Sequence, residues 1–242
     1  MTEQIIINHV SKSLGDVQVL KDIDFDMHAG RIYGFIGPSG SGKTTLVRMI
    51  AGMDYPTKGS IYVRDKTVPH MSLMHEIGFM AQSDALYLDL TGRENLEFYA
   101  SLYSLNRQTK EKRIRYTADL VGLTHDLKKR VSHYSGGMKR RLSLATALLH
   151  DPTILILDEP TVGIDPELRS MIWDELDKLK QQGKTIIITT HVMDEAERCD
   201  DIVMIKDGMS LTEGSPEELK ARFHAASFDE VFINAGKKQV SQ

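Results

Sequence analysis

The segment Gly37–Thr44, with the sequence GPSGSGKT, constrains this chain more than any other. It matches the pattern G-x-x-x-x-G-K-[ST] at every fixed position. The apolar run Ile32–Ile36 precedes it and a helical pattern from about Lys43 to Met49 follows, so the predicted order is strand, glycine-rich turn, helix. Such a turn points successive backbone N–H groups inward, next to the positive end of the helix, where they bind phosphate oxygens. An ordinary glycine-rich turn is the alternative.

The fixed positions of this motif have individual roles. Lys43 is predicted to reach the β- and γ-phosphates of a nucleotide, and the hydroxyl of Thr44 to bind Mg²⁺. The nucleotide-binding residues predicted here are Gly37, Pro38, Ser39, Gly40, Ser41, Gly42, Lys43, Thr44 and Thr45.

A second apolar run ends in two carboxylates. Ile154–Leu157 leads directly into Asp158 and Glu159. Open α/β sheets bind their ligands at the carboxyl ends of parallel strands. We therefore predict that Asp158 holds Mg²⁺ through its water shell and that Glu159 orients an attacking water and accepts its proton. A buried strand followed by an acidic helix start is the alternative.

The apolar patterns around these motifs predict an α/β protein. Between residues 23 and 27, apolar side chains alternate with aspartates, which predicts a half-buried antiparallel strand, and residues 59–63 predict another. The runs 154–157, 185–190 and 202–205 are short, consist of β-branched or aliphatic residues and are separated by helical segments. This alternation is typical of a parallel sheet that is buried on both faces.

Residues from about 89 to 150 have a helical pattern. Thr91 and Glu94 form a predicted capping box, in which each side chain bonds the backbone N–H of the other residue. β-strand character returns after this stretch, and no Pro/Ser-rich linker bounds it. We therefore interpret it as a helical insertion within one α/β domain.

Composition limits the classes of function. The 242 residues include 30 Lys+Arg and 34 Asp+Glu, a net charge of −4, which argues against a dedicated nucleic-acid binder. We interpret the basic clusters Lys128–Arg130 and Lys139–Arg141 as solvated helix faces. No apolar stretch approaches the ~20 residues needed to span a bilayer, and a lone cysteine, Cys199, fits a reducing compartment.

The residues Ser135-Gly136-Gly137-Met138-Lys139 resemble the signature motif of ATP-binding cassette (ABC) transporters, with Met138 where Gln is commoner. Ser135 and the two glycine amides would open a helix and form a second anion site, although an ordinary Ser N-cap is the alternative. The chain is similar to the nucleotide-binding subunits of this family over about residues 3–220. This similarity implies a P-loop NTPase (RecA-like) core with a mainly parallel sheet, an N-terminal antiparallel β subdomain and an inserted α-helical subdomain. We assign residues 1–220 to the ABC ATPase domain and 221–242 to a short C-terminal extension.

The resemblance also assigns roles to four other residues. Gln82 matches the glutamine that joins the core to the helical insertion and senses Mg²⁺ and the attacking water, and Asp165 matches a loop that contacts a partner subunit. Without the resemblance, the alternatives are that Gln82 is an ordinary surface residue and that Asp165 belongs to a Pro-containing turn. His191 ends the predicted strand 185–190, in reach of a γ-phosphate. Leu14 stands where the family presents an aromatic ring to adenine, so we expect weaker stacking here.

The resemblance therefore implies a Mg²⁺-dependent ATPase with Glu159, His191, Lys43 and Gln82 as catalytic residues. ATP would lie between Gly37–Thr44 of one subunit and Ser135–Gly137 of a second, with a homodimer expected. An integral membrane permease would be the other partner, no nucleic acid is expected, and the chain would lie peripherally on the cytoplasmic face of the cell membrane.

Two features favour export, namely Met138 and the segment 226–232, which resembles a closing segment frequent in exporter-type subunits that serve drug, sodium or antibiotic efflux. The alternative is a soluble ABC-type ATPase that acts on nucleic acid or the ribosome. Such proteins normally carry two cassettes or a long coiled-coil insertion, and this chain has neither. A binding module without catalysis is disfavoured because every catalytic position is filled. The transported substance stays open.

Overall fold

The computed structural model describes residues 3–83 and 85–240, and the chain divides into two compact units. The first unit combines residues 1–71 with 185–242, and the second contains residues 72–184. In the described residues, no helix is both long enough and apolar enough to cross a bilayer.

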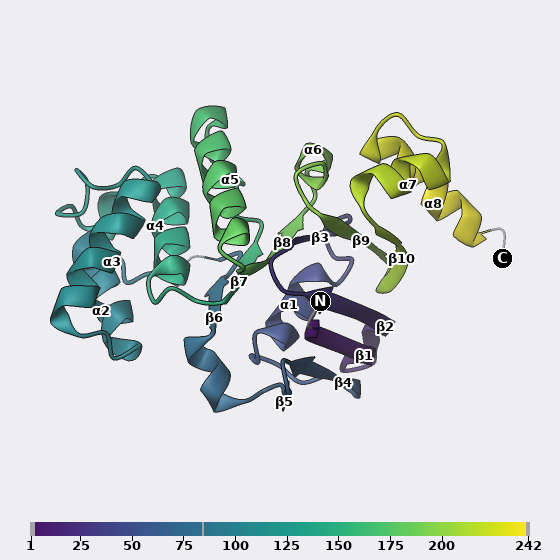
Figure 1. Cartoon of the computed structure of the whole chain (residues 1–242), viewed down its shortest axis with the longest axis horizontal. Helices are drawn as coiled ribbons and strands as arrows, with labels where there is room; N and C mark the ends of the chain where they lie inside the picture. The colour runs from purple at the N-terminus through teal and green to yellow at the C-terminus, as the bar shows by residue number, and fades with distance from the viewer. Residues whose placement is uncertain (1–2, 84, 241–242) are drawn as a thin grey trace. The chain divides into compact units, whose positions relative to one another are not determined.

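The first unit contains an antiparallel sheet built from β1 (Glu3–Leu14), β2 (Val17–His28), β4 (Lys58–Val63) and β5 (Lys66–Thr67), in the order β2-β1-β4-β5 (Figure 1). Within β2, Ile23 and Met27 are buried whereas Asp24 and Asp26 are exposed. The alternation in the sequence therefore corresponds to one buried and one solvated face. The predicted N-terminal antiparallel subdomain is confirmed.

A second, mixed sheet lies in the same unit and includes β10 (Met209–Gly214), β9 (Asp201–Lys206), β3 (Ile32–Ile36) and β8 (Thr185–Thr190), in that order. The central strand β3 pairs in parallel with both β8 and β9, while β10 pairs with β9 antiparallel. All residues of β3 and β8 are buried, as expected for parallel strands that are covered on both faces.

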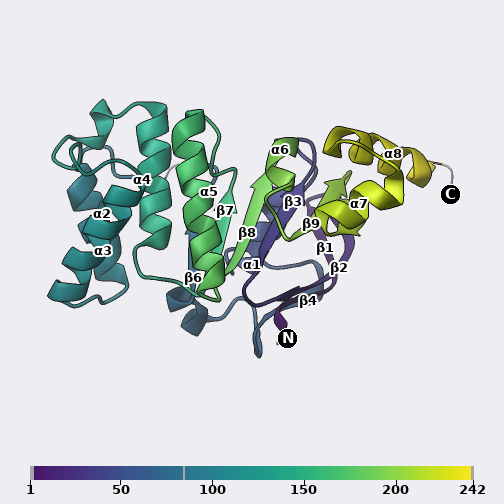
Figure 2. The ribbon, with the colours of Figure 1, turned by 45° about the horizontal axis from the view of Figure 1, so that its top comes forward.

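The helices of the first unit are α1 (Lys43–Ile50), α6 (Met193–Ala196), α7 (Pro216–Phe223) and α8 (Phe228–Val240). In the predicted C-terminal extension, α8 lies against α7 (Figure 2). Phe228 and Val231 of α8 are buried. Helix α7 begins with Ser215 as N-cap in a capping box with Glu218.

The second unit is mainly helical. It contains the 3-10 helices η1 (Met71–His75, whose first residue belongs to the first unit) and η2 (Val131–His133), and α2 (Gly92–Leu102), α3 (Arg107–Leu120), α4 (Gly136–Leu148) and α5 (Pro166–Gln181). Its strands β6 (Ile77–Met80) and β7 (Ile154–Asp158) pair in parallel. Helix α4 packs against α2, α3 and β6. The capping box of Thr91 and Glu94 starts α2 as predicted. The sequence patterns did not predict β6.

Candidate nucleotide-binding and catalytic site

The glycine-rich turn follows β3 and curls tightly before α1. A Cβ atom on Gly37 would lie 2.0 Å from the carbonyl oxygen of Ile205, so only glycine fits there. Gly40 and Gly42 have φ values of +80° and +106°, in the region that favours glycine. Gly42 is the N-cap of α1 and supplies no side chain to bond the first amides of the helix, which suits these amides for an anion.

Polar side chains of this turn point into its interior. Lys43 is only 5% exposed, and its Nζ donates to the carbonyl oxygens of Gly37 at 2.7 Å and Pro38 at 2.9 Å. The Oγ of Ser41 is buried and has no hydrogen-bond partner among the described residues. Because buried polar groups are nearly always bonded, a phosphate oxygen is the kind of partner that this hydroxyl fits. The turn therefore suits a phosphate group.

Two of the predicted catalytic side chains meet in the second unit. Asp158 ends β7 and is 1% exposed, and Glu159 follows with a φ of +53°. For a residue with a side chain, this left-handed conformation costs roughly 1–2 kcal/mol, so the surroundings must hold it. The Nε2 of Gln82 donates to Oε2 of Glu159 at 3.1 Å. The structure thus brings Gln82 and Glu159 together, as predicted side chains of one site.

Ser135 and Asp165 each cap a helix. The Oγ of Ser135 accepts from the N–H of Met138 at 3.2 Å at the start of α4, and a carboxylate oxygen of Asp165 accepts from the N–H of Leu168 at 3.0 Å at the start of α5. The N-cap alternative for Ser135 therefore holds, Asp165 caps a helix that begins with Pro166, and the predicted contacts of both residues with a partner stay predictions. A Cβ on Gly137 would lie 3.0 Å from the carbonyl oxygen of Gly163, so the two turns are neighbours.

The remaining predicted residues lie in the first unit. His191 follows β8 and is exposed, and Thr44 and Thr45 at the start of α1 are half-buried. Leu14 ends β1 opposite Val17, and the two side chains are 54% and 65% exposed. This exposed aliphatic pair forms the end of the β1–β2 hairpin.

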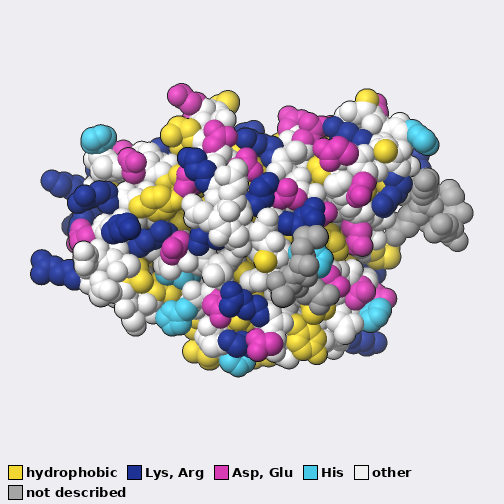
Figure 3. Space-filling model, in the orientation of Figure 1, with side chains coloured by type: hydrophobic (Ala, Val, Ile, Leu, Met, Phe, Trp, Pro, Cys, Tyr) yellow, Lys and Arg dark blue, Asp and Glu magenta, His cyan; other side chains and the backbone are white. Residues whose placement is uncertain are grey.

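The structure corrects the interpretation of the second basic cluster. Lys139–Arg141 was predicted to be a solvated helix face, but Arg140 is only 7% exposed and points inward from α4. Its guanidinium donates to the carbonyl oxygens of Gln82 at 2.8 Å and of Glu159 at 2.6 Å. A residue that the sequence patterns placed in solvent therefore contacts the backbone of both site residues. By contrast, Lys128–Arg130 are exposed, but they lie in the turns after α3 and not on a helix. Figure 3 shows basic side chains over the part of the second unit that contains α2 and α3.

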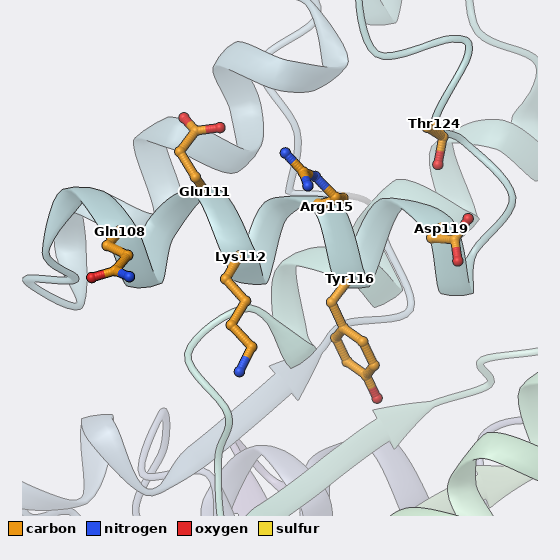
Figure 4. A pocket seen from close by; sticks show the side chains of 7 residues that line it. All are labelled: Gln108, Glu111, Lys112, Arg115, Tyr116, Asp119 and Thr124. Carbon is orange, nitrogen blue, oxygen red and sulfur yellow. The ribbon is translucent and has the colours of Figure 1, made fainter.

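A pocket of about 700 Å³ lies elsewhere in the second unit, along α3. Figure 4 shows that Lys112 and Tyr116 extend to one side of the helix whereas Glu111 and Arg115 extend to the other, so these groups do not converge on one point. Glu111 is already ion-paired with Arg93 at 2.6 Å. The pocket contains no predicted site residue; its lining residues are Gln108, Glu111, Lys112, Arg115, Tyr116, Asp119 and Thr124.

Comparisons with known proteins identify the family of the chain. The sequence profile of the ABC transporter family matches residues 20–162. The chain is 42% identical to the Nod factor export ATP-binding protein I of Rhizobium etli over 218 residues, which cover 89% of this chain and 69% of that protein. It is 39% identical to the protein of the same name from Burkholderia lata, covering 89% of this chain and 72% of the relative.

Solved structures show the same fold. An ATP-binding subunit of an ABC transporter superposes with a TM-score of 0.89 at 26% identity, covering 96% of this chain and 99% of that one. The dimeric ATP-binding cassette MJ0796, in a post-hydrolysis state bound to ADP and Pi, superposes with a TM-score of 0.81 at 27% identity, covering 87% and 98%. The chain belongs to the ABC transporter family and is one of its ATP-binding, ATP-hydrolysing subunits.

Proposed function

We propose that this subunit hydrolyses Mg²⁺-bound ATP, as half of a dimer, to drive export through a separate membrane permease. The hydrogen bond between Gln82 and Glu159 carries the hydrolytic part of the proposal, because it joins an amide that could position a water to a carboxylate that could accept the proton of that water. Export is supported by the relatives from Rhizobium etli and Burkholderia lata, which are Nod factor export ATP-binding proteins.

In the proposed reaction, the turn Gly37–Thr44 binds the phosphates and Lys43 neutralises charge on the β- and γ-phosphates. Glu159 takes the proton from the attacking water, and His191 bonds the γ-phosphate from the end of β8. Each of these groups acts by position and charge, because phosphoryl transfer needs little covalent chemistry from the protein.

Oxygen donors from Thr44, Gln82 and Asp158 would hold Mg²⁺. A hydroxyl, an amide and a carboxylate are hard ligands of the kind that Mg²⁺ selects, and the carboxylate of Asp158 is 1% exposed. Among residues 3–83 and 85–240, no group of three or more His, Cys, Asp or Glu side chains could hold a metal ion. When bound, the cation supplies charge neutralisation at the transferring phosphoryl group.

The second anion site is proposed to act on the partner's nucleotide. Ser135, Gly136 and Gly137 open α4, and Asp165 caps α5 beside them. Helix N-termini attract anions, so this turn suits the γ-phosphate of an ATP held by the phosphate-binding turn of a second copy. The two solved structures of MJ0796 are dimeric, which supports a dimer of such subunits.

An exposed aromatic surface after Gln82 is proposed to contact the permease. The rings of Tyr87 and Phe98 pack edge to face with centroids 4.7 Å apart, and those of Phe98 and Tyr99 at 5.5 Å. Tyr87 and Leu88 are 48% and 49% exposed. Clustered exposed aromatic groups are typical of protein interfaces. The surface would place the subunit peripherally on the cytoplasmic face of the membrane.

Two experiments test the proposal. ATP turnover of Glu159→Gln should fall about 100-fold or more while ATP binding is retained, since the amide cannot accept a proton. Equal turnover in the two proteins contradicts the assignment of Glu159 as the base. Native protein should be recovered with membranes together with an integral membrane subunit. Recovery wholly in the soluble fraction with ribosomes or DNA would contradict transport.

A further inference from the structure

We propose that Arg140 is a positioning residue for hydrolysis, because its guanidinium fixes the backbone on which Gln82 and Glu159 are mounted. The inference rests on the proposed roles of these two side chains. It adds a third residue, from helix α4, that touches neither ATP nor water in the proposed reaction but sets the geometry of both groups that do.

The contacts of Arg140 form a fork. Its Nη1 donates to the carbonyl oxygens of Ala81 at 2.7 Å and Gln82 at 2.8 Å. Its Nη2 donates to the carbonyl oxygen of Glu159 at 2.6 Å and also to that of Asp158. One planar guanidinium, with donors in a fixed arrangement, therefore joins two backbone segments that are far apart in the sequence.

The two bonds from Nη2 act directly on the conformation of Glu159. The carbonyls of Asp158 and Glu159 belong to the peptide groups on either side of the Glu159 Cα, whose φ is +53°. Bonding both oxygens to one nitrogen holds the left-handed turn between them. The direction in which the Glu159 carboxylate leaves the backbone is thereby fixed.

The two bonds from Nη1 fix the other side of the pair in the same way. Because the fork is rigid, it also sets the distance between the backbones of Gln82 and Glu159, which their side chains bridge at 3.1 Å. A misplacement of ~1 Å at a reacting geometry can cost about 100-fold in rate. Loss of the fork is therefore expected to slow hydrolysis without removing any group that binds ATP.

The neighbouring residue provides a matched control. Arg141 lies on the same helix and also donates to two backbone carbonyl oxygens, those of Val121 and Gly122, both at 3.2 Å. These carbonyls belong to the turn after α3 and not to the site. Replacement of Arg141 removes the same kind of interaction from the same helix, so it measures the general structural cost.

The experiment compares steady-state ATP hydrolysis by the unmodified chain with hydrolysis by three variants, Arg140→Gln, Arg140→Lys and Arg141→Gln. We expect kcat to fall about 10- to 100-fold in Arg140→Gln, with KM for ATP changed by less than about twofold. The kcat of Arg140→Lys should lie between those of Arg140→Gln and the unmodified chain, because an ammonium keeps the charge but not the planar fork. Arg141→Gln should keep kcat within about twofold.

A double-variant comparison separates positioning from general damage. If Arg140 acts through the pair, Arg140→Gln should lower kcat much less in a Gln82→Ala background than in the unmodified chain, since the pair is already broken. Full additivity, an unchanged kcat, or an equal fall in Arg141→Gln would overturn the inference. If Arg140→Gln does not fold, Arg140→Lys decides by the same criteria. If Glu159→Gln loses turnover as expected but the Arg140 variants stay fully active, only the inference about Arg140 is refuted and the proposed function stands.

Discussion

His150 should make the stability of the second unit depend on pH. Its ring stacks on that of Tyr103, with centroids 3.7 Å apart and planes 8° apart, and its Nε2 lies 3.2 Å from the carbonyl oxygen of Ile77, to which the neutral ring donates. Burial is the main cause that lowers the pKa of His150 from 6.5 to about 4, helped by the nearby charges of His75 and Arg113 and opposed by the Ile77 bond and by Asp151.

The direction and size of the effect follow from linkage between protonation and folding. In the unfolded chain the ring binds a proton at its ordinary pKa of 6.5, and in the folded chain only near 4. Between these values the unfolded chain holds more protons, so the stabilisation is present above pH 6.5 and is lost as the pH falls toward 4. From pH 7 to pH 5 the two pKa values give a loss of about 2 kcal/mol, which partial solvation of the ring reduces to about 1–2 kcal/mol.

Urea unfolding at pH 7 and pH 5 measures this loss. Trp173, the single tryptophan of the chain, is 1% exposed on α5 in the same unit as His150, so its fluorescence reports on the relevant unfolding. The control is His150→Phe, which keeps a ring to stack on Tyr103 but does not titrate. We expect the free energy of unfolding to fall by about 1–2 kcal/mol more in the unmodified protein than in the variant. Equal falls in the two proteins would refute the reasoning.

Three other substitutions test the site and the fold. Leu14→Tyr should restore a ring beside adenine and tighten ATP binding by about 1 kcal/mol, roughly fivefold, in a titration; an unchanged affinity contradicts this base contact. Gly37→Ala places a Cβ 2.0 Å from the Ile205 carbonyl oxygen. The loop must move to remove that overlap, at a cost of about 1–3 kcal/mol, which should weaken ATP binding on the order of tenfold or more. Normal binding would exclude this turn as the phosphate site. Thr91→Ala removes the 3.1 Å bond from the Glu94 N–H and should lower the free energy of unfolding by about 1 kcal/mol, whereas Thr91→Ser should not.

Local patterns predicted most of the fold. The strand Ile32–Ile36, the turn after it and the helix from Lys43 were predictable because glycine positions and a continuous apolar run act within a few residues of each other. Strand β6 was not, because it has only four residues, Ile77–Met80, and is defined by pairing with β7, far along the chain. A Cβ atom on Gly78 of this strand would lie 2.2 Å from the carbonyl oxygen of Ala147 in α4. This close packing of strand and helix requires glycine, and no local sequence pattern expresses it.

The candidate site likewise contains features that local patterns predict and features that depend on distant groups. The placement of motif residues was predictable, with Lys43 at the start of the helix after the glycine-rich turn and Glu159 directly after a buried strand, because such motifs fix residue types at a fixed spacing. The cap formed by Ser135 was also predictable, since an N-cap bond spans only three residues. Whether Ser135 also binds the phosphate of a second subunit depends on a neighbour outside this chain, so no local pattern decides it.

Arg140 shows where reasoning from residue type fails. Successive residues on a helix are separated by about 100°, so the three basic residues Lys139–Arg141 spread over about 200° of the helix surface. Helix α4 packs against α2, α3 and β6, and of these three residues only Arg140 is buried. A guanidinium that turns inward must find acceptors, because a buried charge without them is costly. Backbone carbonyls where β7 ends and after β6 supply those acceptors, so the helical position that buries Arg140 also brings its guanidinium to the residues proposed to perform hydrolysis.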